Sequence, residues 1–255
     1  MTTNDEAKPA NTADQLAQLT HRATLRREAG REVPAGPKAR RTRRALLNAA
    51  LGLFSEQGYH DTSVGEIAER AGVSLGTVYQ YFRNRADVVA ALIVDGSSHM
   101  LQRTDTRWRA EEGRAGLHRV IENFVSAYRD ADSLNRIWEE VCHREPELAE
   151  LRRSLGRMLT EPVEAELLRA GRVGLARQFT PREAELAARA LTGMVDRYCY
   201  VTYVFDPPDD GAPPPEESAR IITDLWCSAI GLAEPAVSST DTPAASRAAS
   251  EHGPG

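Results

Sequence analysis

The sequence has few cysteines and no long apolar run. Its three cysteines are widely spaced among 255 residues and form no C-x-x-C pair. This pattern argues against a disulfide framework and a zinc knuckle, and it favours a reducing compartment, the cytoplasm. No stretch approaches the roughly 18 consecutive apolar residues of a membrane span. The polar first 16 residues lack the apolar segment of a secretory signal, so we expect no membrane association.

The common signatures of enzymes and nucleotide-binding sites are also missing. The patterns G-x-x-x-x-G-K-[ST], G-x-G-x-x-G, H-E-x-x-H and G-x-S-x-G do not occur. Glu140-x-x-His143 matches half of the di-iron bundle signature, but no second match supplies the other half. Cys142 and His143 are adjacent, so on a helix they point about 100° apart and make a poor metal pair. We therefore expect no catalytic residue, metal or cofactor; the alternative is a helical-bundle, metal-dependent enzyme.

Positive charge is concentrated near the N-terminus of an acidic chain. The whole chain carries a net charge of −5, yet residues 1–44 hold ten Lys or Arg against five Asp or Glu, which leaves +5 there and −10 in the rest. Residues 37–44 contain five cations and no acid. A basic end on an acidic body is typical of a small DNA-binding unit attached to a larger domain with another role. The alternative is a solubilising tail.

Hydrophobic periodicity indicates helices along the chain, so the expected fold class is all-α. Residues 1–36 and 233–255 are polar or rich in Pro, Ala, Ser and Thr and predict disorder, and the proline-rich segment 206–215 predicts a loop. Only Tyr198–Phe205 alternates like a strand, but it continues a helical run without a turn signal, so we interpret it as helix. Beyond residue 85, the expected helices span 86–103, 114–131, 133–143, 146–171, 181–205 and 216–232.

Residues 63–74 predict a short helix followed by a tight turn. Ser63 and Glu66 have the spacing of a capping box, which starts a helix. Gly72 can adopt the left-handed conformation that ends this helix, and Ser74 can cap the next one. The apolar face of the first helix consists of Val64, Ile67, Ala68 and Ala71.

The next helix, Leu75–Phe82, buries Val78 and Phe82 at an i, i+4 spacing and leaves polar and aromatic residues outside. Two short helices joined by a glycine-containing turn, the second with such a face, predict a helix-turn-helix. The second helix of this motif enters the major groove of DNA with its N-terminal residues at the base edges. The expected core of this small domain consists of Phe54, Ile67, Ala68, Val73, Val78 and Phe82.

Five sequence segments of this region occur in order and without gaps. They are Thr42-Arg-Arg-Ala-Leu-Leu-x-Ala-Ala50, Phe54-x-x-x-Gly58-Tyr59, Thr62-Ser-Val-x-x-Ile67-Ala68, Ala71-Gly-Val-Ser-x-Gly-Thr-Val-Tyr79 and Tyr81-Phe-x-Asn-Arg85. Together they resemble the DNA-binding domain of the TetR family of transcriptional regulators, over about a fifth of the chain. Arg85 stands where the family usually has Lys. Leu75 and Gly76 stand where it often has Lys or Pro, which leaves the operator sequence open.

The resemblance implies a set of DNA-contacting residues. In this sequence they are Arg41, Thr42, Arg43, Ser63, Ser74, Leu75, Gly76, Thr77, Tyr79, Gln80, Tyr81 and Arg85. Thr77 and Gln80 can hydrogen-bond to bases or backbone, and the family likeness favours Tyr79 at a phosphate or a thymine methyl. Tyr79 and Tyr81 point apart, so at most one of them belongs to the core.

Other residues of this set are expected to position the domain on the DNA backbone. Thr42, Ser63 and Arg85 would bind phosphates rather than read bases. The cations of residues 38–44 precede Thr42 or follow it closely, and we expect them to form a flexible arm before the first helix that strengthens binding to any DNA sequence. The expected division of the chain is a disordered arm at 1–36, a helix-turn-helix domain at 37–85, a helical domain at 86–232 and a disordered tail at 233–255.

For residues 86–232 the resemblance implies a helical domain that binds an effector and dimerises. The many apolar residues of its middle helices favour a largely hydrophobic ligand. The candidate ligand-binding residues are Trp108, Phe124, Tyr128, Trp138, Cys142, Met158, Met194, Arg197 and Tyr198. Asp196 and Arg197 interrupt an apolar stretch, either as an interhelical ion pair or as a polar anchor for a ligand. The expected dimer face consists of Ala187, Ala190, Leu191, Met194, Val195, Tyr198, Leu225, Trp226 and Ile230.

The sequence thus predicts a cytoplasmic homodimeric regulator of transcription. By resemblance, it would bind a palindromic operator in double-stranded DNA as a repressor, and a hydrophobic small-molecule effector would release it. An activator or a ligand-independent regulator with the same fold is the alternative within this class.

Overall fold

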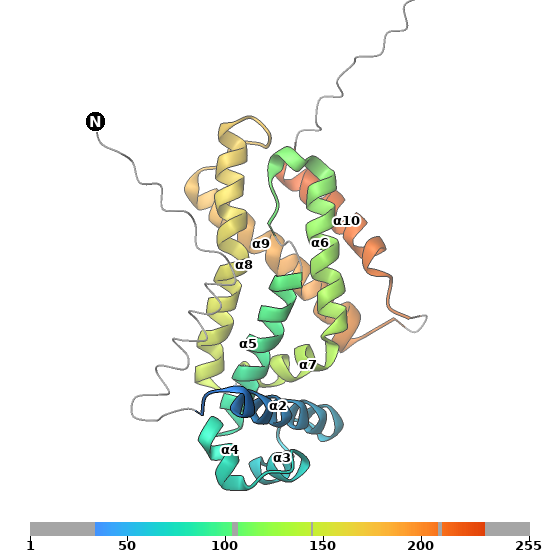
Figure 1. Ribbon diagram of the computed structural model, residues 1–255. Helices are drawn as coiled ribbons and strands as arrows, with labels where there is room; N and C mark the ends of the chain where they lie inside the picture. Colours follow the sequence, from blue (N-terminus) through green and yellow to red (C-terminus); the bar gives the residue numbers. More distant parts are fainter. Residues whose placement is uncertain (1–33, 104–106, 144, 209–210, 233–255) are drawn as a thin grey trace, which may run out of the picture.

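The computed structural model describes residues 34–103, 107–143, 145–208 and 211–232 (Figure 1). Within these ranges every regular element is helical and no strand occurs, so the all-α prediction is confirmed and the strand alternative for Tyr198–Phe205 is wrong. The disorder predicted at both ends concerns residues that lie mostly outside these ranges. None of the described helices is long and apolar enough to cross a membrane.

Three helices form the N-terminal unit: α2 (Pro37–Gln57), α3 (Val64–Arg70) and α4 (Leu75–Tyr81). Helix α5 (Arg85–Arg103) runs from this unit into the rest of the molecule (Figure 1). Each helix of the N-terminal unit contributes a fully buried side chain to its core: Leu46, Ile67 and Val78. Val88 of α5 is fully buried in the same core. The core positions predicted for this domain are buried, apart from Val73, which is partly buried against the core.

The remaining elements form a helical body. After a short 3-10 turn at Ala110–Glu112 come α6 (Gly113–Asp130), α7 (Asp132–Val141), α8 (Pro146–Arg172) and α9 (Pro181–Tyr200). A π-helical turn, η2 (Val201–Phe205), extends α9, and α10 (Pro215–Ile230) follows the proline-rich loop. These bounds agree within two residues with the helices predicted from the sequence. Helices α6 and α10 pack together, as do α8 and α9.

The molecule has two hydrophobic cores, and α7 belongs to the core of the N-terminal unit. Ile137 and Val141 of α7, with Leu148 and Leu151 of α8, are buried in the same cluster as the N-terminal helices. The second cluster joins α6, the C-terminal half of α8, α9 and α10. In Figure 1, α7 lies directly against α2. The N-terminal unit therefore shares its core with the first part of the body.

Residues 38–44 differ from the sequence prediction. We expected them to form a flexible arm, but α2 begins at Pro37, so all five cations lie in its first turns. A proline at the first helical position and the helix-favouring residues Lys, Ala and Arg explain this start. The arm prediction is wrong for these residues, and for residues 1–33 it lies outside the described ranges.

Candidate DNA interface and effector pocket

Local hydrogen bonds cap the starts of α3 and α4, and a glycine turn joins the two helices. The Ser63 hydroxyl accepts from the backbone N–H of Glu66 at 3.1 Å, and the Glu66 carboxylate accepts from the backbone N–H of Ser63 at 2.7 Å. Gly72 has a φ of +68°, the left-handed conformation expected at this turn. Ser74 caps α4 by accepting from the backbone N–H of Thr77 at 3.1 Å. The predicted caps and turn are confirmed.

One face of α4 is exposed in the part of the chain that the structure describes. Val78 is fully buried, whereas Leu75 is 46% and Tyr79 is 39% exposed. Gly76 and Gln80 are also exposed, and Tyr81 packs partly against the core. Only one of the two tyrosines thus belongs to the core, as predicted. A short helix with an exposed polar and aromatic face on a rigid domain suits the major groove.

Two predicted phosphate-binding arginines already have partners inside the protein. Arg43 forms a bidentate pair with Asp95 of α5, at 2.6 and 3.1 Å. Arg85 donates from Nη1 to the backbone carbonyls of residues 59, 60 and 62, at 2.7, 2.8 and 2.6 Å. Its guanidinium carbon lies 4.7 Å from the centroid of the Tyr59 ring. Arg85 therefore holds the α2–α3 loop, a role that the sequence pattern did not predict.

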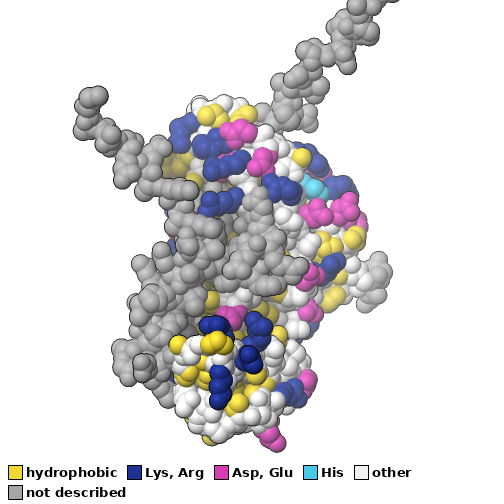
Figure 2. All heavy atoms as spheres, in the orientation of Figure 1, with side chains coloured by type: hydrophobic (Ala, Val, Ile, Leu, Met, Phe, Trp, Pro, Cys, Tyr) yellow, Lys and Arg dark blue, Asp and Glu magenta, His cyan; other side chains and the backbone are white. Residues whose placement is uncertain are grey.

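The other cations of α2 are exposed, and they fall on two faces of the helix. Arg40 and Arg44 share a face with Leu47 and Leu51, and this face lines the pocket described below. Lys38 and Arg41 lie roughly 100–200° around the helix from that face. Figure 2 shows Lys and Arg side chains gathered over the lower domain, with few acidic ones among them. The domain that carries α4 is thus locally basic on an acidic protein.

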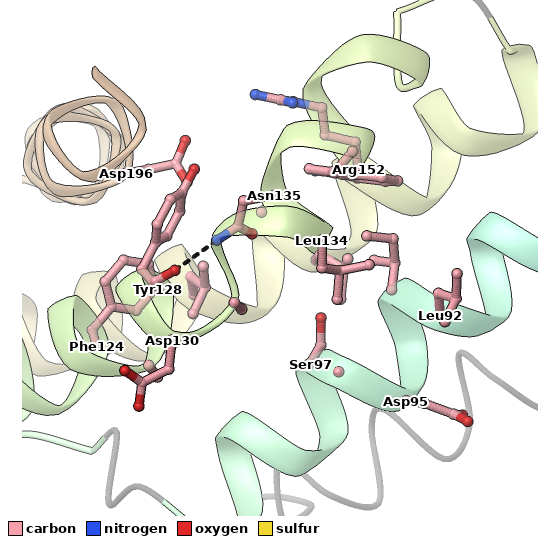
Figure 3. Close-up of a pocket in the computed structure, with 18 of the residues that line it drawn as sticks. Leu92, Asp95, Ser97, Phe124, Tyr128, Asp130, Leu134, Asn135, Arg152 and Asp196 are labelled. Atoms are coloured by element: carbon pink, nitrogen blue, oxygen red, sulfur yellow. Dashed lines mark hydrogen bonds between the residues drawn. The ribbon is translucent and has the colours of Figure 1, made fainter. Parts of the chain in front are cut away.

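A large pocket of about 1450 Å³ lies between the N-terminal unit and the body. Residues of α2, α5, α6, α7, α8 and α9 line it (Figure 3). Three of the predicted ligand-binding residues, Phe124, Tyr128 and Trp138, line this pocket, and their rings form an aromatic wall. Leu134, Leu155 and Leu159 add aliphatic surface.

The other predicted ligand residues do not line this pocket, which corrects the prediction for each of them. Trp108 is buried in the second core, and Cys142 and Met158 are buried elsewhere. Tyr198 shares a 2.8 Å hydrogen bond with Ser218 of α10, and Met194 packs beside the second core. Arg197 stacks over the ring of Tyr200 at 4.8 Å. Helical spacing predicted that these residues are apolar or inward-facing, but not which cavity they face.

Asp196 lines the pocket from α9 and is half-buried. The alternative of an interhelical ion pair is wrong within the described residues, since neither Asp196 nor the exposed Arg197 pairs with a charged residue of another helix. Among the described residues the Asp196 carboxylate has no hydrogen-bond or ion-pair partner. Burial raises its pKa, opposed by the charge of Arg152. Burial and the nearby Asp196 also raise the pKa of Tyr128, and Figure 3 shows the two side chains side by side.

Arg152 is a pocket residue that the sequence analysis did not single out. Its Nη1 lies 2.6 Å from Glu139 Oε1 and 2.9 Å from Cys142 Sγ. Glu139, Cys142 and His143 bring their ligand atoms within 4.8 Å of one another, because α7 ends at Val141 and the argument from helical angles does not apply beyond it. The guanidinium of Arg152 supplies positive charge beside this cluster through its contacts with Glu139 and Cys142.

Polar contacts also join the N-terminal unit to the body. The Tyr59 hydroxyl donates to Glu145 Oε1 at 3.3 Å, and His60 Nε2 lies 3.7 Å from Glu140 Oε1. Burial and the adjacent Glu145 raise the pKa of Tyr59 to about 12. The α2–α3 loop therefore contacts the end of α7 and the start of α8.

The predicted dimer face needs revision. Leu191, Val195, Trp226 and Ile230 are buried within the single chain, at 7% exposure or less. By contrast, Leu225 of α10, which the prediction included, is 53% exposed, and so are Leu186 of α9 (49%) and Ile221 of α10 (47%), which it did not include. Apolar periodicity indicated two buried faces on these helices but did not distinguish the internal one from the external one.

Comparisons with known proteins agree with this architecture. The sequence profile described as "Bacterial regulatory proteins, tetR family" matches residues 46–92, from within α2 into α5. The HTH-type transcriptional regulator BetI of Serratia proteamaculans is 28% identical over 162 residues, which cover 60% of this chain and 77% of BetI.

Two solved structures share the fold. A protein described as a TetR-family transcriptional regulator from Mesorhizobium loti has a TM-score of 0.57 at 20% identity, covering 76% of this chain and 98% of that one. FadR of Bacillus subtilis, in complex with stearoyl-CoA, has a TM-score of 0.54 at 22% identity, covering 73% and 98%. The likeness extends over both the N-terminal unit and the body.

Proposed function

We propose that this chain is a TetR-family transcriptional repressor controlled by a small molecule. It binds a palindromic operator as a homodimer, and a largely hydrophobic effector in the pocket lowers its affinity for that operator. It acts in the cytoplasm, where the DNA is, and has no catalytic role.

The single observation that carries this proposal is the position of α7. Leu134, Asn135 and Trp138 line the pocket, while Ile137 and Val141 on the same helix are buried in the core of the DNA-binding domain. A ligand that moves α7 therefore acts on both sites, which is the physical requirement for coupling them. The Tyr59–Glu145 and His60–Glu140 contacts at the end of α7 extend the same connection.

The exposed face of α4 supports the DNA-binding part of the proposal. The exposed faces of α9 and α10 support the dimer, since Leu186, Ile221 and Leu225 present apolar side chains that a second copy would cover. A two-fold dimer binds two half-sites about 34–36 Å apart along one face of the duplex, and the operator is then palindromic.

The pocket supports a hydrophobic effector. Its aromatic and aliphatic walls suit an apolar molecule, and its volume of about 1450 Å³ exceeds that of typical drug-sized sites. The structurally similar FadR was solved with stearoyl-CoA, a molecule with a long apolar chain. A repressor is favoured over a constitutive regulator because a pocket that contacts α7 gives the ligand a route to the DNA-binding domain.

The experiment begins with purified full-length protein and a random double-stranded DNA library, from which bound sequences are enriched. Recovery of an inverted repeat, bound by two chains, supports the proposal. A compound library is then screened for release of the labelled operator by fluorescence anisotropy. Failure to enrich any sequence would overturn DNA-binding regulation, and release by no compound would favour the ligand-independent alternative. An operator that activates a reporter gene when bound would favour the activator.

A further inference from the structure

We propose that the effector of this pocket is an amphipathic anion. Its acidic head group binds to Arg40 and Arg44 of α2, and its apolar part lies against the aromatic and aliphatic walls. This inference names the ligand class of the site, so it rests on the proposed function only for the assignment of the pocket to the effector.

The lining of the pocket is basic, although the chain as a whole is acidic. Among the described residues, seven arginines and three aspartates line it, which gives the lining a formal charge of +4 in a chain of −5. The arginines are residues 40, 43, 44, 152, 153, 157 and 189, and the aspartates are residues 95, 130 and 196. A concave surface of one charge sign attracts ligands of the opposite sign. The lining therefore favours an anion over a cation of the same size.

Arg40 and Arg44 differ from the other five arginines because their side chains form no hydrogen bond or ion pair within the described part of the chain. The others form ion pairs: Arg43 with Asp95 at 2.6 Å, Arg152 with Glu139 at 2.6 Å, Arg153 and Arg157 with the same Glu150 at 2.7 and 3.7 Å, and Arg189 with Glu185 at 3.2 Å. The positive charge that a ligand can neutralise is thus concentrated on α2.

The spacing of Arg40 and Arg44 suits one anionic group. Residues four apart on a helix are neighbours on its surface, and like charges at this spacing repel each other. An anion between the two guanidinium groups removes this repulsion. Each guanidinium also presents a planar set of N–H donors that matches the oxygens of a carboxylate or a phosphate.

The same face of α2 continues from charged to apolar side chains. Leu47 and Leu51 follow Arg40 and Arg44 along the helix and line the pocket with them. A rise of 1.5 Å per residue places Arg40 and Leu51 roughly 16 Å apart along the helix axis. Leu51 packs against the core of the N-terminal unit, as does Trp138 of the aromatic wall. An elongated ligand can therefore place its head group at the arginines and its apolar part along the leucines.

The Asp196 carboxylate does not offset these arginines. Figure 3 shows Asp196 beside Tyr128 at one side of the pocket and Asp95, which pairs with Arg43 of α2, at the other. Burial raises the pKa of Asp196, and the charge of Arg152 opposes this effect. A buried carboxylate can also lose its charge by taking up a proton, whereas an arginine in a protein keeps its charge. The charge on Arg40 and Arg44 therefore remains for an anion to neutralise.

Decanoate, decyltrimethylammonium and decan-1-ol test this selection directly, because they share a straight alkyl chain of nearly the same length and differ in head-group charge. Binding of each to the full chain, below the concentration at which it forms micelles, is measured by isothermal titration calorimetry without DNA. We expect decanoate to bind more tightly than decan-1-ol and at least about tenfold more tightly than decyltrimethylammonium.

Two double variants locate the head group. Arg40→Gln with Arg44→Gln should weaken decanoate binding by about tenfold or more and leave the affinity for decan-1-ol unchanged, because the apolar walls remain. Lys38→Gln with Arg41→Gln is the matched control, since it removes the same charge from the same end of α2 at two residues that do not line the pocket. It should change decanoate binding little. Thermal unfolding checks that both variants are folded.

Three results would each overturn the inference: a decanoate affinity no higher than that of the ammonium, equal losses in the two double variants, or binding of none of the three probes. None of these readouts involves DNA. A chain that binds decanoate through Arg40 and Arg44 but enriches no DNA sequence therefore overturns the proposed function alone. A chain that enriches an operator but prefers the ammonium overturns this inference alone.

Discussion

Arg85 and Tyr59 form a stacked pair at the junction of the DNA-binding domain and the body. The guanidinium of Arg85 lies 4.7 Å from the Tyr59 ring centroid, and its Nη1 donates to the Tyr59 carbonyl at 2.7 Å. The hydroxyl of the same tyrosine donates to Glu145 at 3.3 Å. The α2–α3 loop is thus held from one side by α5 and from the other by the start of α8.

Arg85→Ala should lower the free energy of unfolding by about 2–3 kcal/mol, since it leaves three carbonyls of the loop without their charged donor. Urea denaturation followed by circular dichroism measures this. Arg70→Ala is the control, because it removes an exposed ion pair with Glu56 that solvent screens, so it should destabilise the chain much less.

The same Arg85 variant should weaken binding to every DNA sequence about equally, because the loop positions α3 and α4 without reading bases. A variant with wild-type stability and reduced DNA affinity would instead indicate a direct phosphate contact, as the sequence predicted.

Gln80→Ala should cost about 1–3 kcal/mol in binding to the operator and less on random DNA, if the exposed side chain of Gln80 reads a base edge. Thr77→Ala should have a smaller effect, because the Thr77 hydroxyl already shares a 2.9 Å hydrogen bond with Ser74. Fluorescence anisotropy on both DNAs separates the two roles. Equal losses on operator and random DNA would make Gln80 a backbone contact.

Arg41→Ala should reduce the slope of log affinity against log salt by about one, as expected for one lost phosphate contact. Arg40→Ala, one residue away but on the pocket face of α2, should change the slope less. Truncation of residues 1–36 tests the arm separately, since it leaves α2 intact. Equal slopes for both variants and the parent chain would place the phosphate contacts elsewhere.

Leu225→Glu should produce folded monomers that lose the operator, because Leu225 is 53% exposed on the apolar face of α10. Trp226→Glu, at the adjacent residue, should instead unfold the chain, since Trp226 is buried in the core at 5% exposure. Light scattering gives the oligomeric state and circular dichroism the fold. A Leu225→Glu protein that stays dimeric would exclude this face as the interface.

The sequence predicted the helices and caps well because these depend on local chemistry. Ser63, Gly72 and Ser74 each act within a few residues of their own position, so spacing alone was sufficient. It also placed the exposed face of α4 correctly, since burial of Val78 determines which residues face outward. Pro37 is also a local signal for the start of a helix, but the run of cations after it led to the prediction of a flexible arm.

The pocket and the interface depend on how helices pack, and periodicity does not determine that. Trp108 and Tyr128 are both buried in the second core, yet only Tyr128 also lines the pocket. Arg152 gave no signal, because only the tertiary structure brings it to Glu139. Asp196 was noticed as a charge within an apolar stretch, but its lack of a partner follows from the direction of Arg197.

The free energy of unfolding should depend on the ionisation of Asp196, because folding half-buries this carboxylate. Burial raises the pKa of Asp196 above its ordinary value, so the folded chain binds this proton at a higher pH than the unfolded chain does. The groups that act on it are Tyr128 from α6, Glu139 from α7, Arg152 from α8 and Arg197 from α9.

An acid whose pKa is raised by folding destabilises the chain above that pKa and ceases to do so once it is protonated. Asp196→Asn should therefore be at least as stable as the parent chain at neutral pH, and this difference should shrink as the pH falls through the raised pKa of Asp196. Urea denaturation of both chains, from neutral pH down to the acid limit of folding, measures the difference. A stability difference that does not change with pH would assign the effect of the substitution to a cause other than the charge of Asp196.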